Sequence, residues 1–92
     1  MRVAFDVDGT LIVKNSNGDD VPRYSVIQLL FLMKQFGCEI YVWSGGGFDY
    51  ATRWCEKLGI EGLVHVCRKG EIVPDIAVDD MECKLGTLNI KV

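Results

Sequence analysis

Two aspartates stand close together near the start of the chain, directly after an apolar run. Val3 to Phe5 reads as a buried strand, and Asp6-Val7-Asp8-Gly9 follows it. Side chains two positions apart in an extended segment lie on the same side, so we expect Asp6 and Asp8 to point together into the crevice beyond the strand. Neighbouring carboxylates repel each other unless a cation or a proton relieves the repulsion. The pair therefore indicates a metal site, acid–base chemistry, or both.

The same residues could instead form a solvated turn or part of a calcium-binding loop. A turn would not need an apolar strand leading into it. A calcium loop would need oxygen ligands at alternate positions and a closing glutamate, whereas the apolar-rich stretch Thr10 to Val13 follows here. The metal or acid–base interpretation is therefore preferred.

Polar residues also follow two later apolar segments. Ser44 and the glycines 45–47 come after Ile40 to Trp43, and Asp79-Asp80 comes after Ile76-Ala77-Val78. A hydroxyl and free amides before a helix can hold an anion, although the same residues could simply cap the helix. Two adjacent carboxylates that close a buried strand favour a bound cation.

A basic pair, Arg68-Lys69, follows a further short apolar segment, Leu63 to Val66. Alone, Lys69 would be taken for a surface lysine. Beside a phosphate and a nucleophilic carboxylate it would neutralise charge that develops in the transition state. Arg68 is a rival for that role, and the sequence leaves the choice open.

Taken in order, these four features resemble the four motifs of the haloacid dehalogenase superfamily of phosphotransferases, over about Val3 to Asp80. The resemblance implies that Asp6 is the nucleophile and a metal ligand. It implies that Asp8 is the general acid/base and lends its backbone carbonyl to the metal, Mg²⁺. It further implies metal binding by Asp79 and Asp80 and phosphate binding by Gly9, Thr10, Ser44, Gly45 and Lys69.

The elements that must position these residues can be placed from the apolar pattern. We expect strands at 2–6, 38–43, 63–66, 76–78 and 88–92, and a hairpin or flap over 9–21. A first helix should begin at Pro22, with Asp20 as its cap, and end near Phe36 before Gly37. Its core face should contain Val26, Leu29, Leu30, Met33 and Phe36. A second helix is expected over 48–58, with Tyr50, Ala51, Trp54, Cys55 and Leu58 facing inward.

Alternation of strands and helices predicts an α/β fold, with one doubly wound, Rossmann-like and mostly parallel sheet of about five strands. With 92 residues, the chain is expected to form a single domain, 1–92. No segment is left for the cap domain that this family usually carries, so we expect an open site. Residues 81–86 are short for a helical crossover, which leaves the direction of the last strand open; the resemblance favours a parallel strand.

The leading functional hypothesis is a magnesium-dependent phosphomonoester hydrolase that works through an aspartyl-phosphate. The alternatives are a phosphomutase, a receiver-like signalling domain and a non-catalytic phosphate-binding scaffold. Phosphomutases in this family generally need a cap, and receivers place the phospho-acceptor on a middle strand. The substrate, a small molecule or the end of a macromolecule, is not encoded in any motif.

Composition limits the remaining classes of function. A net charge of −3 and the absence of a basic run do not support nucleic-acid binding, although distant residues could still form a basic patch in space. No stretch is long and apolar enough for a membrane span, and the first residues lack the layout of a signal peptide, so we expect a cytoplasmic protein. The four cysteines have no metal-ligand spacing and are expected to be free thiols.

A second apolar stripe on the first helix, formed by Tyr24, Ile27 and Phe31, would not be buried by one face of a sheet. Two covers are compatible with the sequence. One is a twofold homodimer through this helix, and the other is the flap, through Leu11 or Val13.

Overall fold

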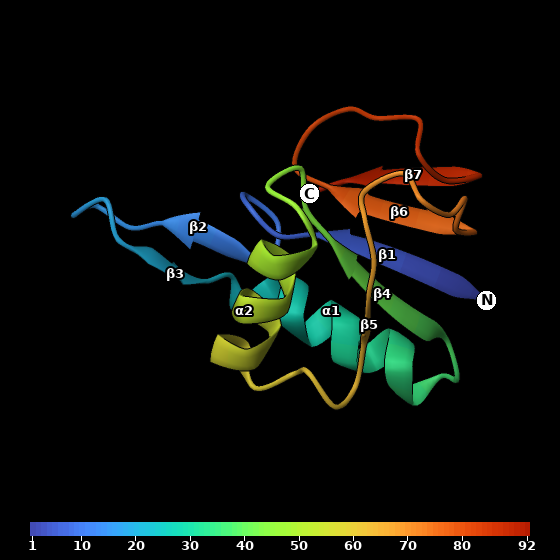
Figure 1. Cartoon of the computed structure of the whole chain (residues 1–92), viewed down its shortest axis with the longest axis horizontal. Coiled ribbons are helices and arrows are strands. Elements are labelled where there is room, and N and C mark those ends of the chain that lie inside the picture. The colour runs from blue at the N-terminus through green and yellow to red at the C-terminus, as the bar shows by residue number, and fades with distance from the viewer.

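The computed structural model describes residues 1–92, and its main feature is a sheet of five parallel strands (Figure 1). The strand order is β5-β4-β1-β6-β7, and β2 and β3 form a separate antiparallel hairpin. In chain order the elements are β1 (Arg2–Asp6), β2 (Ile12–Lys14), β3 (Asp20–Pro22), α1 (Tyr24–Gln35), β4 (Glu39–Trp43), α2 (Phe48–Leu58), β5 (His65–Val66), β6 (Ile76–Asp79) and β7 (Leu88–Lys91).

The first strand lies at the centre of the sheet, as its apolar sequence predicts. β1 pairs in parallel with β4 on one edge and with β6 on the other. Val3, Ala4 and Phe5 are fully buried, because strands flank both edges of β1 and packed layers cover both of its faces. The structure thus confirms the α/β class and the five-stranded, Rossmann-like parallel sheet.

Both helices pack on the same face of the sheet, where most of the core lies. The residues that they bury there are Val26, Ile27, Leu30, Ala51 and Cys55. On the opposite face, Ile72 and Leu85 from the connecting segments 67–75 and 80–87 pack against a small cluster around Trp43. The strand order is therefore that of a doubly wound sheet. Helices cover only one of its two faces, whereas irregular segments cover the other. The two connections are short and contain glycine or proline, which disfavour a helix.

The start of α1 differs from the sequence prediction. Pro22 belongs to β3, where it pairs with Ile12, and Asp20 forms an ion pair with Lys14 of 2.9 Å rather than capping the helix. The helix begins at Tyr24, and no side chain caps it. The hairpin continues one residue further than expected because its antiparallel register includes Pro22.

The apolar stripe predicted on α1 is split by the packing of the helix. Ile27 is buried in the same cluster as Leu11 and Ile12, so it is not available for the predicted homodimer contact, and the flap supplies part of its cover. Tyr24 and Phe31 remain exposed. Phe36, which was expected in the core, is 79% exposed because α1 ends at Gln35 and the chain turns away after it.

The later elements agree more closely with the sequence. The second helix has the predicted bounds and ends at Gly59, which adopts the left-handed conformation. β5, expected over 63–66, is shorter than predicted and contains only His65 and Val66. The last strand, β7, is parallel to β6, so the parallel alternative is confirmed.

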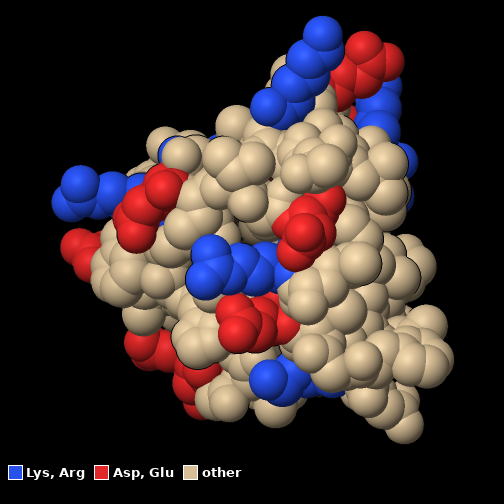
Figure 2. Space-filling view, turned by 90° about the vertical axis from the view of Figure 1, so that its right-hand side faces the viewer, with Lys and Arg blue, Asp and Glu red and all other residues tan.

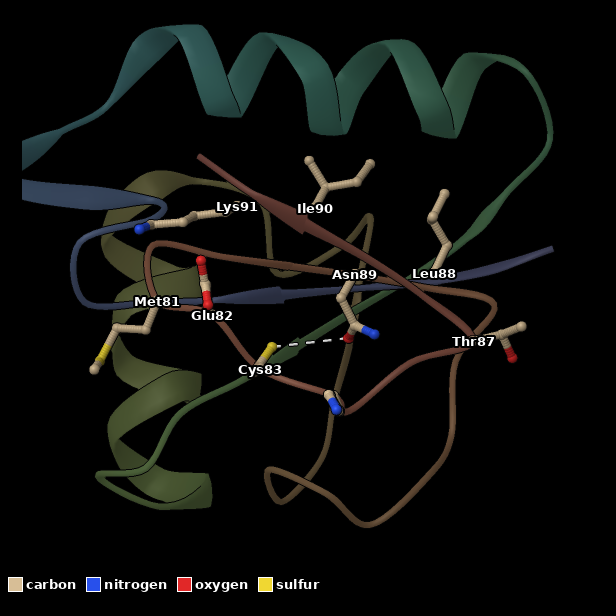
Figure 3. Close-up of a pocket in the computed structure, with 9 residues that line it drawn as sticks. Met81, Glu82, Cys83, Thr87, Leu88, Asn89, Ile90 and Lys91 are labelled. Atoms are coloured by element: carbon tan, nitrogen blue, oxygen red, sulfur yellow. Dashed lines mark hydrogen bonds between the residues drawn. The ribbon is translucent and has the colours of Figure 1, made fainter.

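The connection between β6 and β7 contains no helix, and the side chain of Asn89 holds its backbone by hydrogen bonds. Asn89 accepts hydrogen bonds from the amides of Leu85 and Gly86 at 3.0 and 2.9 Å and donates one to the carbonyl of Gly86 at 2.9 Å. Gly86 passes so close to β6 that a Cβ would lie 2.8 Å from the amide nitrogen of Ala77. Figure 3 shows Asn89 between β7 and this loop, with Cys83 beside it, in a hollow of about 580 Å³ at the β7 edge.

The face of the molecule in Figure 2 shows no large patch of a single charge sign. In that view acidic and basic side chains are interspersed, and no continuous basic area is formed. Neither helix has the length and apolar character required to cross a lipid bilayer.

We predict that Asn89→Ala lowers the free energy of unfolding by about 2 kcal/mol, because it leaves two partly buried amides and a carbonyl without partners. Urea denaturation would measure this loss. Asn17→Ala, in the exposed hairpin turn, is the matched control and should change stability little. Equal effects of the two substitutions would show that Asn89 does not hold the connection.

Candidate functional site

Three neighbouring strands bring their carboxyl ends together on the side from which the β2–β3 hairpin projects (Figure 1). β1 ends at Asp6, which lies opposite Trp43 of β4 in the sheet register, and Ser44 follows directly. On the other side β6 ends at Asp79. The parallel register therefore places the first, second and fourth sequence motifs beside one another, as expected.

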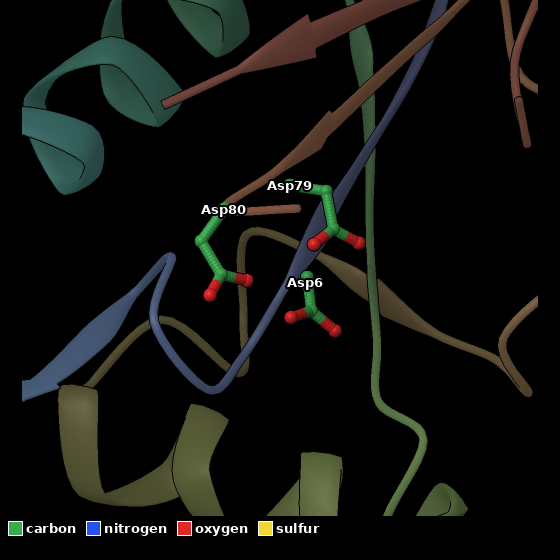
Figure 4. A group of neighbouring side chains, drawn as sticks. All are labelled: Asp6, Asp79 and Asp80. Atoms are coloured by element: carbon green, nitrogen blue, oxygen red, sulfur yellow. The ribbon is translucent and has the colours of Figure 1, made fainter. Parts of the chain in front are cut away.

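Asp6, Asp79 and Asp80 form a tight acidic group (Figure 4). Each offers a carboxylate oxygen within 4.8 Å of those of the other two. Asp6 is only 6% exposed and Asp79 is also buried, whereas Asp80 is partly exposed. Two of the three carboxylates are thus removed from water. The repulsion between charges is stronger in the protein interior than in water.

Lys69 supplies the positive charge for this group. Its ammonium lies 3.1 Å from Oδ1 of Asp6 and 2.8 Å from Oδ2 of Asp79, and it donates a hydrogen bond to each. Burial disfavours the ammonium, but the bonds to Asp79 and Asp6 outweigh burial and raise the pKa of Lys69. Lys69, and not Arg68, is therefore the basic residue that the fold brings to the aspartates.

The two buried aspartates respond differently to this environment. Burial raises the pKa of Asp6 from 3.8 to about 6, because the hydrogen bond from Lys69 only partly offsets desolvation and the nearby charge of Asp79. Burial also acts on Asp79, but hydrogen bonds from Lys69 and from the Met81 amide outweigh it and lower the pKa of Asp79. The charged form of Asp6 is thus less well stabilised by its surroundings than the charged form of Asp79.

The acidic group fits a divalent cation. Three carboxylates face a single ammonium, and Asp80 has no basic partner of its own. Burial and the neighbouring Asp79 raise the pKa of Asp80 more than its own amide and the charge of Lys69 lower it, so its charged form is only partly compensated within the chain. Carboxylate oxygens are the hard ligands that Mg²⁺ prefers. Asp6, Asp79 and Asp80 could therefore hold such an ion.

Gly9 allows Asp80 to lie against the loop that follows β1. Its φ of +77° is in the left-handed region, and a Cβ on Gly9 would overlap the carboxylate of Asp80. A side chain at this position would push Asp80 out of the acidic group. The glycine of the first motif thus has a steric role that its sequence position alone does not reveal.

Asp8 does not join the other aspartates. Its side chain is exposed and accepts a hydrogen bond of 2.7 Å from the hydroxyl of Tyr50 in α2. This bond raises the pKa of Tyr50, so the hydroxyl stays protonated and remains a donor. The carboxylate of Asp8 therefore lies outside the group formed by Asp6, Asp79 and Asp80, and its contact within the chain is with α2.

The Ser44 loop has the features of an anion cradle. Ser44 is buried, and its Oγ accepts a hydrogen bond of 3.0 Å from the Gly46 amide, which leaves its hydroxyl proton free to donate. The amides of Gly45 and Gly9 donate to no other group in the chain. The start of α2 follows the loop, and its first amides are also free, as at any helix N-terminus.

Two further predicted residues are placed away from the acidic group. Thr10 is fully buried, its amide donates to the carbonyl of Val7, and its hydroxyl has no hydrogen-bond partner, so it offers no surface to a phosphate. Arg68 lines a shallow hollow of about 640 Å³ beside the Ser44 loop, together with Phe48 and Glu71.

Sequence reasoning missed two residues that hold the loop after β1. Tyr50 was assigned to the core face of α2, and neither it nor Arg23 was given a contact with this loop. The guanidinium of Arg23 donates a hydrogen bond of 2.9 Å to the carbonyl of Gly9. A signal existed for Tyr50: it lies in the first turn of a helix that begins at the site, and helical side chains lean toward the N-terminus.

Comparisons of the chain with protein-family models, with curated proteins and with solved structures found no match.

We predict that Asp6→Asn stabilises the metal-free protein at pH 7.5 by about 1 to 3 kcal/mol. Because the pKa of Asp6 is about 6 in the folded chain and 3.8 in its ordinary state, the native protein binds this proton more tightly than the unfolded chain does. The stability associated with Asp6 is thus present below pH 3.8 and is lost as the pH rises through about 6.

Urea denaturation in the presence of EDTA, at about pH 4 and pH 7.5, would test this prediction. The gain in the variant should appear only at the higher pH. A variant that is less stable than the parent at pH 7.5 would mean that the pair with Lys69 outweighs burial.

Proposed function

We propose that this chain is a magnesium-dependent phosphomonoester hydrolase of the haloacid dehalogenase superfamily, working through an aspartyl-phosphate on Asp6. The observation that carries this proposal is the position of Asp6. It is a buried carboxylate at the end of the central strand, held by Lys69 and flanked by Asp79 and Asp80. An anion cradle at Ser44 begins one strand away.

In the first step, a carboxylate oxygen of Asp6 attacks the phosphorus of the substrate. The bond between phosphorus and the leaving oxygen breaks, and Asp8 gives its proton to that oxygen. In the second step, water attacks the phosphorus, Asp8 takes a proton from the water, and the bond to Asp6 breaks. Inorganic phosphate leaves, and both aspartates return to their starting states.

The surrounding residues fit the charge that moves in these steps. Lys69 and the Ser44 loop would bind the phosphoryl oxygens and stabilise their charge in the transition state. Bound Mg²⁺, held by Asp6, Asp79 and Asp80, would reduce the repulsion between an anionic nucleophile and an anionic substrate. The raised pKa of Asp6 in the metal-free chain shows that its charged form is poorly stabilised there, so a bound cation would stabilise it.

We further propose that the site has no cap domain. Between Gly9 and Trp43 the chain contains only the β2–β3 hairpin, α1 and β4, and between Gly45 and Arg68 only α2 and β5. These are the two places where caps are inserted in this family. An open crevice would admit a phosphate on a small molecule or at the end of a macromolecule.

Asp6→Asn should abolish hydrolysis of p-nitrophenyl phosphate, with a loss on the order of 10³-fold or more in kcat, because the nucleophile is removed. EDTA should abolish activity in the parent, and added Mg²⁺ should restore it. Asp19→Asn, in the exposed hairpin turn, is the control and should retain the activity of the parent.

Turnover that survives in Asp6→Asn would refute the covalent mechanism. A parent that binds phosphate analogues but shows no sustained turnover would instead favour a receiver-like or scaffold domain.

Beryllium fluoride with Mg²⁺, a mimic of the aspartyl-phosphate, should raise the melting temperature. At about a hundred times Kd the increase should be on the order of 10 °C, because only the folded chain binds the mimic. The shift should disappear in Asp80→Asn and persist in Glu82→Gln, an exposed acidic neighbour. An undiminished shift in Asp80→Asn would remove Asp80 from the proposed metal site.

A further inference from the structure

Tyr50 is the only group in the chain that fixes the carboxylate of Asp8. The side chain of Asp8 is exposed, and its sole hydrogen bond within the protein is the one that Oδ1 accepts from the Tyr50 hydroxyl, at 2.7 Å. These two residues are 42 positions apart, one in the loop after β1 and the other in α2. The orientation of Asp8 therefore depends on α2 rather than on its own loop.

Tyr50 is itself held in place by the loop that carries Ser44. A Cβ on Gly46 would lie 3.1 Å from Cδ1 and 3.2 Å from Cγ of Tyr50, so the ring packs directly on the backbone of that glycine. The amide of Gly46 in turn donates to Oγ of Ser44. The ring of Tyr50 is thus stacked on the predicted anion cradle while its hydroxyl reaches the loop after β1.

We propose that Tyr50 is a positioning residue that orients Asp8 for proton transfer to the leaving group, an inference that rests on the proposed phosphatase function. The hydroxyl of Tyr50 donates to Oδ1, so the transferable proton of Asp8 is carried on Oδ2. In the first step this proton moves from Oδ2 to the leaving oxygen, and in the second step Oδ2 accepts a proton from the attacking water. Tyr50 keeps its own proton throughout.

A structural role for the same hydrogen bond makes a different prediction. If Tyr50 only anchored α2, its loss would affect every substrate equally. However, α2 is already docked through Ala51 and Cys55, which are buried in the main core. Tyr50→Phe also retains the ring that packs on Gly46. Removal of the hydroxyl therefore changes the Asp8 contact and leaves the packing of the helix in place.

The leaving group provides the test. p-Nitrophenol departs without protonation, whereas an alkyl alcohol needs the proton from Asp8. The value of kcat/KM reports on steps up to departure of the leaving group, so it isolates the first proton transfer. We would measure kcat/KM for p-nitrophenyl phosphate and for an alkyl phosphate in the parent, Tyr50→Phe, Asp8→Asn and the double variant. Tyr24→Phe, an exposed tyrosine of α1, is the matched control.

Tyr50→Phe should lower kcat/KM for the alkyl phosphate on the order of 10-fold, and for p-nitrophenyl phosphate by less than about twofold. In the Asp8→Asn background the additional loss should vanish, because Tyr50 acts through Asp8. Tyr24→Phe should match the parent with both substrates.

Equal losses with both substrates, no loss with either, or an undiminished loss in the Asp8→Asn background would each overturn the role of Tyr50 while leaving the phosphatase intact. A parent that hydrolyses neither substrate would refute the phosphatase itself, and with it the role of Tyr50.

Discussion

The main constraint on the site is the repulsion among the carboxylates of Asp6, Asp79 and Asp80. The parallel sheet brings their oxygens within 4.8 Å of one another, and the surrounding contacts must oppose this repulsion. A fold that needed only stability would not place this charge at the end of its central strand. The single ammonium of Lys69 makes the arrangement tolerable without neutralising it. The remaining negative charge favours a bound cation, and the proposed cation-assisted phosphoryl transfer rests on this property.

The surrounding architecture serves to hold this charge in place. Val3, Ala4 and Phe5 of β1 are fully buried, which restrains Asp6 from moving toward water to relieve the repulsion. Gly9 allows Asp80 to approach the loop after β1, and Arg23 holds that loop by its carbonyl. Tyr50 then connects the loop to α2. Each of these contacts acts on backbone or side-chain position rather than on charge, and together they restrict the site to a small set of geometries.

Much of this arrangement could be predicted from the sequence, because apolar periodicity determines which segments form strands and where they end. The approach of Asp6, Ser44, Lys69 and Asp79 to one edge of the sheet follows from those strand ends. Three features could not be predicted in this way. The burial of Ile27, the exposure of Phe36 and the direction of the Asp8 side chain depend on how separate elements pack.

The strand order places α1 and α2 on one face, because the crossovers from β1 to β4 and from β4 to β5 run in the same direction and such crossovers are right-handed. Whether the opposite face also carries helices depends on whether the later connections are long enough to form them. The start of α1 was missed since Pro22 is compatible with either a strand end or a first helical turn. The register of the hairpin, a contact between distant residues, decides between the two.

The absence of helices on one face has a consequence for the motions of the site. Lys69 and the Met81 amide, which both bond to Asp79, come from the segments 67–75 and 80–87, which contain no regular secondary structure. Such segments open locally at a lower free-energy cost than the sheet does. When segment 67–75 opens, the three aspartates lose their internal counterion. A bound cation that replaced it would reduce the cost of that opening, so cation binding would be thermodynamically linked to the order of this segment.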